Sequence, residues 1–135
     1  MPTLSLKVAP LQNPERYQRL AQELTSLTER LLGNRREVTA VMIEDLPAAR
    51  WHVDGKDVYR PTALLEISIT AGTNTAEEKA AFIQAAFAEL QRQLGCGGPL
   101  EEASYVVVRE LPATDWGYGG QTQKARQAAR LAVSA

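Results

Sequence analysis

The chain has 135 residues, of which 44% are hydrophobic and 23% are charged, and its formal net charge is -1 at pH 7. This composition is typical of one globular domain, excludes intrinsic disorder, and gives no reason to expect nucleic acid or an anionic membrane as a partner. A single cysteine, Cys96, excludes an internal disulfide, and no stretch approaches the ~20 apolar residues of a membrane span. We therefore expect a cytoplasmic protein.

The first predicted element is a β-strand over residues 3–8, where every second residue is apolar. It follows directly after Met1 and Pro2. A proline at position two permits removal of the initiator methionine, and that removal would leave a secondary amine at the start of a rigid element. Because most chains begin with a few loose residues, this start is a feature to explain. Pro2 is therefore a candidate base, and the alternative is a proline without any chemical role.

A helix follows the first strand. Asn13 is a suitable N-cap, Pro14 suits the first helical position, and Gly33 is a suitable C-terminal stop. Apolar residues between them recur at helical spacing, which predicts one buried helical face. The apolar run 40–43 then predicts a second strand.

The same order of elements returns in the second half of the chain. Residues 45–51 (Asp-Leu-Pro-Ala-Ala-Arg-Trp) reappear as 110–116 (Glu-Leu-Pro-Ala-Thr-Asp-Trp), 65 residues later, and the run 40–43 aligns with 105–108. An alternating strand around 65–69 repeats the first strand at an offset of 61. A second helix follows it, starting at a capping box formed by Thr75 and Glu78 and ending at Gly95.

These patterns predict an α+β fold built from two tandem β-α-β units, with a four-stranded sheet and both helices on one face. We expect one domain over residues 1–135, made of repeats at about 2–58 and 61–120 and a helical tail at 121–135. The second strand of each unit is an almost continuous apolar run, which indicates burial on both faces. A partner subunit would cover the free face, so an oligomer is expected.

The tail carries Lys124, Arg126 and Arg130 among alanines. It is predicted to form a short helix that packs on the domain or on a neighbouring subunit. A basic tail that binds an anionic partner is the alternative.

An N-terminal Pro2 that opens a strand, the β-α-β repeat and the segment Trp-Gly-Tyr-Gly-Gly at 116–120 occur together in this chain. This combination resembles the tautomerase superfamily, and within it 4-oxalocrotonate tautomerase, which has an aromatic-Gly-x-Gly-Gly hairpin near its C-terminus. The resemblance covers about residues 2–125. Because the short members of the family are single β-α-β units, this chain resembles two of them fused.

The resemblance implies a homotrimer, no cofactor and no metal. It implies that Pro2, freed of Met1, is the general base of a keto-enol tautomerase, an isomerase acting on a small 2-oxo acid. Relatives use the same proline as an acid in dehalogenation, hydration or decarboxylation, so those reactions are alternatives. A binding or structural oligomer that has lost its chemistry is a third reading. Ala63 aligns with Pro2 and has no free amine, so one site per chain is expected.

The chain departs from the family at the arginines that usually bind the carboxylates of the substrate. Thr73 and a place near Leu11 occupy one of these positions, and Ala40 and Tyr105 occupy the other. Since an arginine fork is well suited to carboxylates, its absence favours a monocarboxylate or aromatic substrate over a dicarboxylate.

The expected substrate-binding residues are Trp116, Tyr105 and Thr73. The arginines that could replace the missing pair are Arg35, Arg36, Arg50, Arg60 and Arg109, and each is alternatively a solvated surface residue. An acid/base role for His52 is the weaker alternative, because its counterpart in the second half is Gly117.

Overall fold

The computed structural model describes residues 2–10 and 13–134. Two points of the sequence interpretation lie outside the described residues: the removal of Met1 and the placement of Leu11 at a former arginine position. Both remain predictions.

The chain contains two similar series of elements. The first half has β1 (Thr3–Ala9), α1 (Pro14–Leu32), a 3-10 turn (Arg36–Val38), β2 (Ala40–Asp45), a second 3-10 turn (Ala48–Arg50), β3 (His52–Val53) and β4 (Lys56–Asp57). The second half has β5 (Thr62–Thr70), α2 (Ala76–Leu94), β6 (Tyr105–Leu111), β7 (Gly117–Tyr118) and β8 (Gln121–Thr122), and it is followed by α3 (Gln123–Ser134). The predicted order of strands and helices is confirmed.

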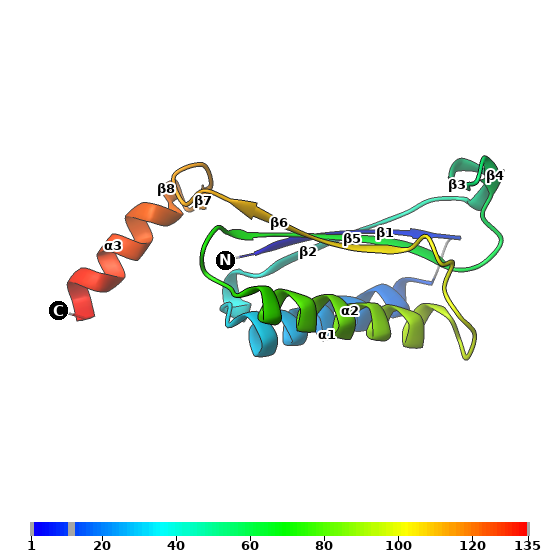
Figure 1. Ribbon diagram of the computed structural model, residues 1–135, viewed down its shortest axis with the longest axis horizontal. Helices are drawn as coiled ribbons and strands as arrows, with labels where there is room; N and C mark the ends of the chain where they lie inside the picture. Colours follow the sequence, from blue (N-terminus) through cyan, green and yellow to red (C-terminus); the bar gives the residue numbers. More distant parts are fainter. Residues whose placement is uncertain (1, 11–12, 135) are drawn as a thin grey trace.

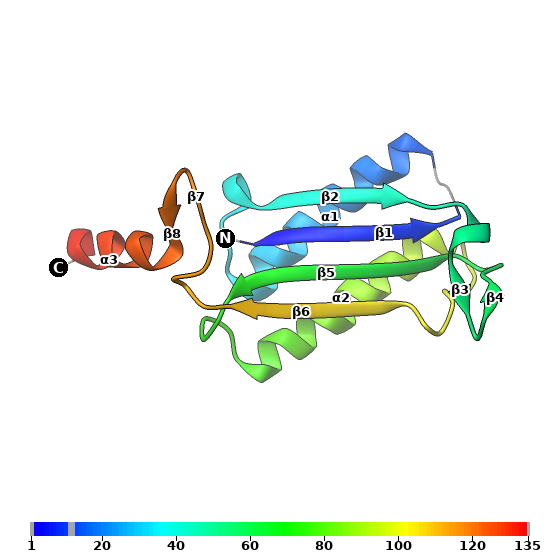
Figure 2. The ribbon, with the colours of Figure 1, turned by 90° about the horizontal axis from the view of Figure 1, so that it is seen from above.

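The four long strands form one sheet in the order β2-β1-β5-β6. Strands β1 and β2 are parallel, β5 and β6 are parallel, and the two pairs meet through antiparallel β1 and β5. Helices α1 and α2 lie side by side against one face of this sheet, and the other face is open (Figures 1 and 2). The tandem β-α-β architecture predicted from the sequence is confirmed.

The strand register shows how closely the two halves correspond. Thr3 pairs with Ala40 in the first half, and Leu64 pairs with Tyr105 in the second, which reproduces the offsets of 61 and 65 residues. Ser5 lies opposite Glu66, the residue 61 positions later. An approximate two-fold axis therefore passes between these two residues, and it relates one end of the sheet to the other.

Local signals set the ends of the two long helices. The Asn13 side chain accepts a hydrogen bond from the Arg16 backbone N–H (3.0 Å) at the start of α1, and Gly33 ends this helix with a φ of 75°. Thr75 and Glu78 form the predicted capping box at the start of α2. Within the described ranges, neither these helices nor α3 is long and apolar enough to cross a membrane.

The core lies between the sheet and the two helices. It is built from side chains that the alternating strand pattern and the helical spacing direct inward, and its largest members are fully buried. The strands supply Leu4, Leu6, Val8, Ala63, Leu65, Ile67 and Ile69, and the helices and following loop supply Leu20, Leu24, Leu27, Leu32, Phe82, Ala86, Leu90, Leu94 and Leu100.

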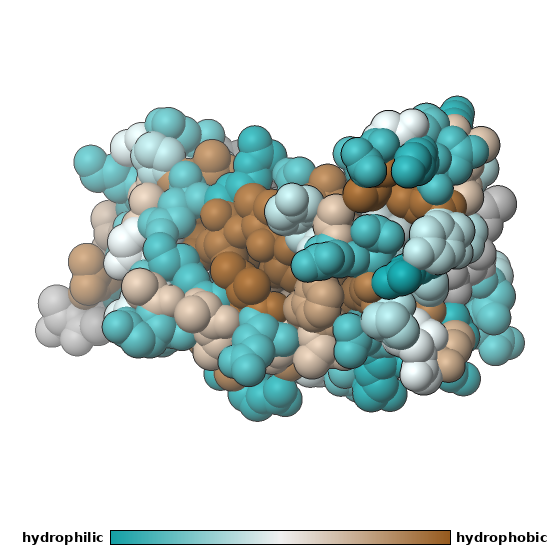
Figure 3. Space-filling model, turned by 45° about the vertical axis from the view of Figure 1, so that its right-hand side comes forward, coloured by the Kyte–Doolittle hydropathy of each residue, from teal (hydrophilic) through white to brown (hydrophobic). Residues whose placement is uncertain are grey.

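The open face of the sheet carries large apolar side chains. Met42 of β2 is 57% exposed, and Tyr105 and Val107 of β6 are 62% and 36% exposed. Figure 3 shows apolar side chains gathered into a patch in the middle of the surface that it draws. In a single chain the second strands are thus covered on one face only, and the predicted burial of the other face requires another molecule.

Candidate active site

Pro2 lies at the end of the sheet where β1 begins. It is buried, and its carbonyl accepts a hydrogen bond from the Ala40 backbone N–H (3.3 Å). One step beyond the paired residues Thr3 and Ser68, Pro2 is level with Ile69 in β5. The hairpin β7–β8 and the start of α3 lie at this same end (Figure 2). The candidate base thus lies where four separate segments of the chain converge.

A cavity of about 260 Å³ opens at this end of the sheet. It lies between the segment that follows α1, the end of β5, the hairpin β7–β8 and α3. Its lining residues are Leu32, Gly33, Asn34, Arg35, Val38, Thr70, Thr73, Tyr118, Gln123, Gln127 and Arg130. In the strand register Pro2 is level with Thr39, just before β2, and with Ile69 in β5. Val38 and Thr70 are the neighbours of these two residues along the chain. The cavity therefore borders the place where β1 starts.

Two guanidinium groups line this cavity. Arg35 comes from the segment after α1, and Arg130 comes from α3. Arg35 also pairs with Glu37 at 3.6 Å, and both of those side chains are largely exposed. A second groove, of about 430 Å³, continues along α3 and shares Arg35, Arg130 and Tyr118. The end of the sheet that holds Pro2 therefore brings two guanidinium groups to one cavity.

Two buried nitrogen atoms near this cavity have no hydrogen-bond partner among the described residues. One is Nε2 of Gln123, a residue that lines the cavity and is 2% exposed. The other is Nε1 of Trp116, in the segment that enters β7. A buried donor without a partner costs free energy, so each of these groups needs an acceptor. The Gln123 amide is suited to a carboxylate or carbonyl oxygen in the cavity.

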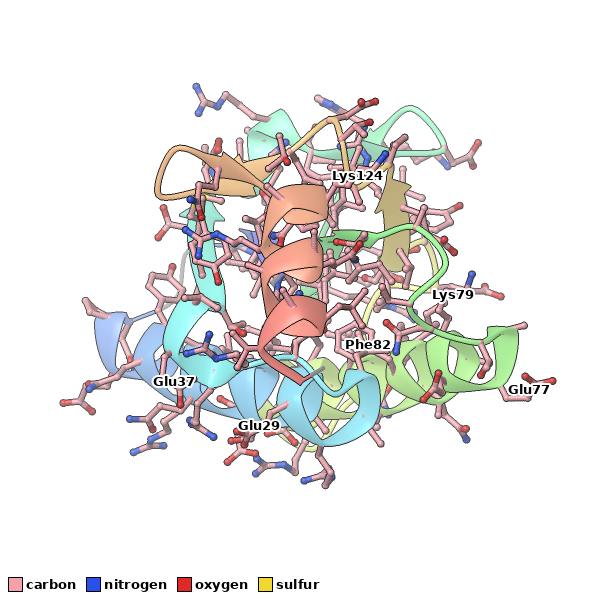
Figure 4. The ribbon with its side chains drawn as sticks, turned by 90° about the vertical axis from the view of Figure 1, so that its left-hand side faces the viewer. Glu29, Glu37, Glu77, Lys79, Phe82 and Lys124 are labelled. Atoms are coloured by element: carbon pink, nitrogen blue, oxygen red, sulfur yellow. The ribbon has the colours of Figure 1, made fainter. Side chains whose placement is uncertain are left out.

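Helix α3 is attached to the hairpin through Arg126. Its guanidinium lies 3.7 Å from the centroid of the Tyr118 ring and donates to the Tyr118 carbonyl (2.8 and 3.2 Å). The Gln123 backbone N–H donates to the Trp116 carbonyl (2.9 Å). Figure 4 looks onto this end and shows α3 standing in front of the sheet, with Lys124 near its start and Glu37 on the segment after α1. These contacts direct Arg130 to the cavity.

The loop that carries Thr73 is held by Glu110, at the end of β6. The Glu110 carboxylate accepts hydrogen bonds from the Lys79 ammonium and from the Gly72 backbone N–H (3.1 Å). These two hydrogen bonds, with the Lys79 contact the larger cause, lower the pKa of the Glu110 carboxyl below its ordinary value. The Thr73 hydroxyl donates to the Thr70 carbonyl (2.7 Å). Thr73 therefore reaches the cavity from a fixed turn.

Three of the four residues expected at the site lie at one end of the sheet. Pro2 directly precedes β1, Thr73 lines the cavity, and Trp116 lines a neighbouring groove of about 280 Å³ with Gly117 and Gly120. Tyr105 is the exception. It begins β6 level with Lys7, five residues from Pro2, and five residues of strand span roughly 16 Å. Within one chain Tyr105 is at the opposite end.

The opposite end of the sheet holds the first-half hairpin and the start of β5. His52 lies there and pairs with Asp57 (2.9 Å), with both side chains more than half exposed. Ala63, the counterpart of Pro2, is fully buried, and its backbone N–H donates to the Ser104 hydroxyl (3.0 Å). The Ala63 nitrogen is thus a backbone amide whose hydrogen is already bonded to Ser104.

Gln123 and Arg130 are cavity residues that no pattern in the sequence indicated. The tail was expected to form a helix, but its basic residues carried no signal of where the helix would point. Arg35 was one of five proposed replacement arginines, and it is the one that lines the cavity. Among the described residues, no group of three or more His, Cys, Asp or Glu side chains could hold a metal ion.

No protein-family model matches the sequence, and no curated protein matches it significantly. Solved structures do match. The Q0 fused 4-OT, a wild-type symmetric trimer, is 26% identical with a TM-score of 0.80, covering 92% of this chain and 98% of its own. Native fused 4-OT is 29% identical with a TM-score of 0.78, covering 91% and 97%. Pt0534, inactivated by 2-oxo-3-pentynoate, has a TM-score of 0.82 at 19% identity, covering 92% and 98%, and this likeness shows the fold alone.

The two tandem β-α-β units and the similar fused 4-OT structures agree with the resemblance found in the sequence. The chain resembles the fused 4-oxalocrotonate tautomerases of the tautomerase superfamily over most of its length.

Proposed function

We propose that the protein is a cofactor-independent keto-enol tautomerase of a small 2-oxo acid, with Pro2 as its general base after removal of Met1. The observation that carries this proposal is the cavity at the Pro2 end of the sheet, which is lined by Arg35 and Arg130. The similarity to fused 4-OT structures, at 26 to 29% identity, supports the same chemistry.

The proposed reaction moves one proton within the substrate. The Pro2 nitrogen accepts the proton of the 2-hydroxyl group of the enol, the C2–O bond becomes a carbonyl, and the resulting ammonium delivers a proton to C3. A free α-amino group has an ordinary pKa of about 7.7–8.0, and neighbouring cations and desolvation disfavour its ammonium form. Such an amine is suited to give and take a proton near neutral pH.

Substrate binding is assigned to the polar groups of the cavity. Arg35 and Arg130 would hold the carboxylate, and the unpaired Nε2 of Gln123 would donate to the oxygen at C2. Thr73 lies on the same cavity, and Trp116 would border the apolar part of the substrate from the neighbouring groove.

We further propose that the protein is a homotrimer. Met42, Tyr105 and Val107 expose apolar surface on the open face of the sheet, and β2 and β6 are both edge strands. The Q0 and F6 fused 4-OT proteins are trimers. In such an assembly Tyr105 would contribute to the site of a neighbouring subunit. Sedimentation equilibrium should give three times the chain mass, and a monomer at micromolar concentration would contradict the proposal.

The test of the catalytic proposal uses 2-oxo-3-pentynoate, the acid that inactivates Pt0534. A free Pro2 amine would add to C4 of this ynone, forming an N–C bond while the triple bond becomes a double bond and C3 gains a proton. Intact mass spectrometry should show a chain without Met1 that gains the mass of one reagent, and peptide mapping should locate the adduct on Pro2. Activity on phenylenolpyruvate should be lost in parallel.

Two results would reject the proposal. One is a chain that retains Met1, since its Pro2 nitrogen would be a tertiary amide without basicity. The other is a processed chain that neither reacts at Pro2 nor accelerates the ketonisation of phenylenolpyruvate or 2-hydroxymuconate, and this result would favour a non-catalytic oligomer.

A further inference from the structure

The approximate two-fold symmetry relates Pro2 to a residue whose nitrogen already has a visible partner. Ala63 corresponds to Pro2 at the offset of 61, and Ser104 corresponds to Thr39 at the offset of 65. The Ala63 backbone N–H donates to the Ser104 hydroxyl at 3.0 Å, and both residues are buried. The equivalent arrangement at the other end of the sheet would place the Thr39 hydroxyl beside the Pro2 nitrogen.

The backbone around Thr39 repeats the backbone around Ser104. The Thr39 N–H donates to the Arg36 carbonyl (3.2 Å), as the Ser104 N–H donates to the Glu101 carbonyl (3.0 Å). The next residue, Ala40, is joined to Pro2 by its N–H (3.3 Å to the carbonyl). Thr39 therefore leaves the main chain at the same place relative to Pro2 as Ser104 does relative to Ala63.

The hydrogen of the Thr39 hydroxyl is already used. Thr39 Oγ1 donates to the Arg35 carbonyl at 2.6 Å, so the oxygen presents lone pairs to any further donor. A proline nitrogen within a peptide bond has no hydrogen to give. Once Met1 is removed, the same nitrogen has one N–H as an amine and two as an ammonium. The acceptor at Thr39 thus matches the processed form of Pro2.

We propose that Thr39 is a positioning residue whose Oγ1 accepts a hydrogen bond from the Pro2 amine and so fixes the direction of the catalytic nitrogen. This inference rests on the proposed function, since it requires a free Pro2. In the ammonium, one N–H would be held by Thr39, and the second would point to the cavity and to C3 of the substrate. Thr39 itself would not touch the substrate.

Charged and titratable groups also lie on the segments at the Pro2 end of the sheet. Arg35, Arg130 and Tyr118 line the cavity, and Glu37 pairs with Arg35. Lys79 and Glu110 form an ion pair under the loop between β5 and α2. The variants chosen below leave all six of these groups unchanged, so a difference in Pro2 titration between them reports on the Thr39 hydroxyl.

The experiment compares Thr39→Val, which has the same shape without the hydroxyl, with Thr39→Ser, which keeps it. Proline labelled with ¹⁵N allows the Pro2 pKa to be read by NMR without turnover. Because a hydrogen bond to the ammonium favours the charged form, Thr39→Val should lower this pKa and reduce kcat on phenylenolpyruvate about tenfold, with KM little changed. Thr39→Ser should restore both values. Ser104→Ala, the matched change at the other end, should alter neither.

An equal Pro2 pKa and an equal kcat in wild type, Thr39→Val and Thr39→Ser would overturn the proposal, as would retention of Met1. Thr39→Ala is a second variant without the hydroxyl, for use if Thr39→Val does not fold. Failure of the tautomerase proposal gives a different pattern: the Pro2 pKa still differs between Thr39→Val and Thr39→Ser, but no variant and no wild-type sample ketonises the substrate.

Discussion

The two ends of the sheet have nearly the same backbone, but the cavity lined by Arg35 and Arg130 lies at the Pro2 end. At the Ala63 end the chain arrives from β4, and the Pro61 carbonyl accepts the Glu101 N–H (2.8 Å) while Ser104 holds the Ala63 N–H. At the other end the counterpart of Glu101 is Arg36, and the preceding residue, Arg35, lines the cavity with Arg130. In this duplicated fold, the backbone that connects the two halves thus makes the two ends of the sheet different.

The largest expected effect comes from Pro2→Ala. If Pro2 is the general base, kcat/KM for phenylenolpyruvate should fall roughly 10²–10⁴-fold, the usual contribution of such a group. The matched change at the opposite end is Ala63→Gly. It alters a buried strand residue and should lower stability, but it should leave kcat/KM unchanged. Equal losses of activity in the two variants would mean that the ends are not functionally different.

The second prediction concerns what the two ends share. Leu4 and Leu65 are equivalent core residues, and both are fully buried. Leu4→Ala and Leu65→Ala should each lower the free energy of unfolding by about 2–5 kcal/mol, and by similar amounts. Chemical denaturation at one fixed protein concentration would measure this, because the proposed trimer would contribute to stability. A cost at one position less than half that at the other would show that the halves are packed differently.

Arginines at the two ends of the sheet should differ in their effect on substrate binding. Arg130→Gln and Arg35→Gln should each raise KM for a 2-oxo acid about tenfold, since each removes a charged hydrogen-bond donor to the carboxylate. Arg60, which lies 5.1 Å over the Tyr59 ring before β5, is the control. Arg60→Gln should leave KM unchanged. Steady-state kinetics with phenylenolpyruvate would test all three, and an unchanged KM in both cavity variants would remove these arginines from the site.

The smallest expected effect is a pH dependence of stability at Glu110. Because Lys79 and the Gly72 N–H lower its pKa in the folded state, Glu110 stabilises the protein above its ordinary pKa of 4.5. This contribution is lost as the pH falls through the lower, folded value. Glu110→Gln should therefore destabilise the protein at pH 7 and less so at pH 3. Lys79→Met should give a similar pH profile, and a difference that grows on acidification would contradict the assignment.

Much of the fold could be predicted from the sequence because each half repeats its own signals. The offsets of 61 and 65 residues correspond to the observed pairs Thr3–Ala40 and Leu64–Tyr105. The helix ends were equally well marked, since Asn13 and Gly33 act within a few residues of their own position. Signals of this kind are local, and they survive in a single sequence.

The site was less predictable because it is assembled from segments that are distant in the sequence. Gln123 and Arg130 reach the cavity only because Arg126 holds α3 to the hairpin at Tyr118, and no periodicity encodes that direction. Tyr105 was expected at the site because it aligns with a binding position of the family. That alignment takes no account of the strand length that separates Tyr105 from Pro2 within one chain.

The pairing of Ser5 with Glu66 at the symmetry axis has a consequence for how such a chain can evolve. In a dimer of identical short chains, a residue at this position would face its own copy, and two glutamates opposed in neighbouring strands repel each other. In a fused chain the two positions are encoded separately, so each can be substituted without the other. Here a small hydroxyl faces the carboxylate, and Glu66 is free to accept a hydrogen bond from Arg109 (3.1 Å) in the next strand. Identical chains must place the same residue on both sides of a two-fold axis, and joining the copies removes this constraint.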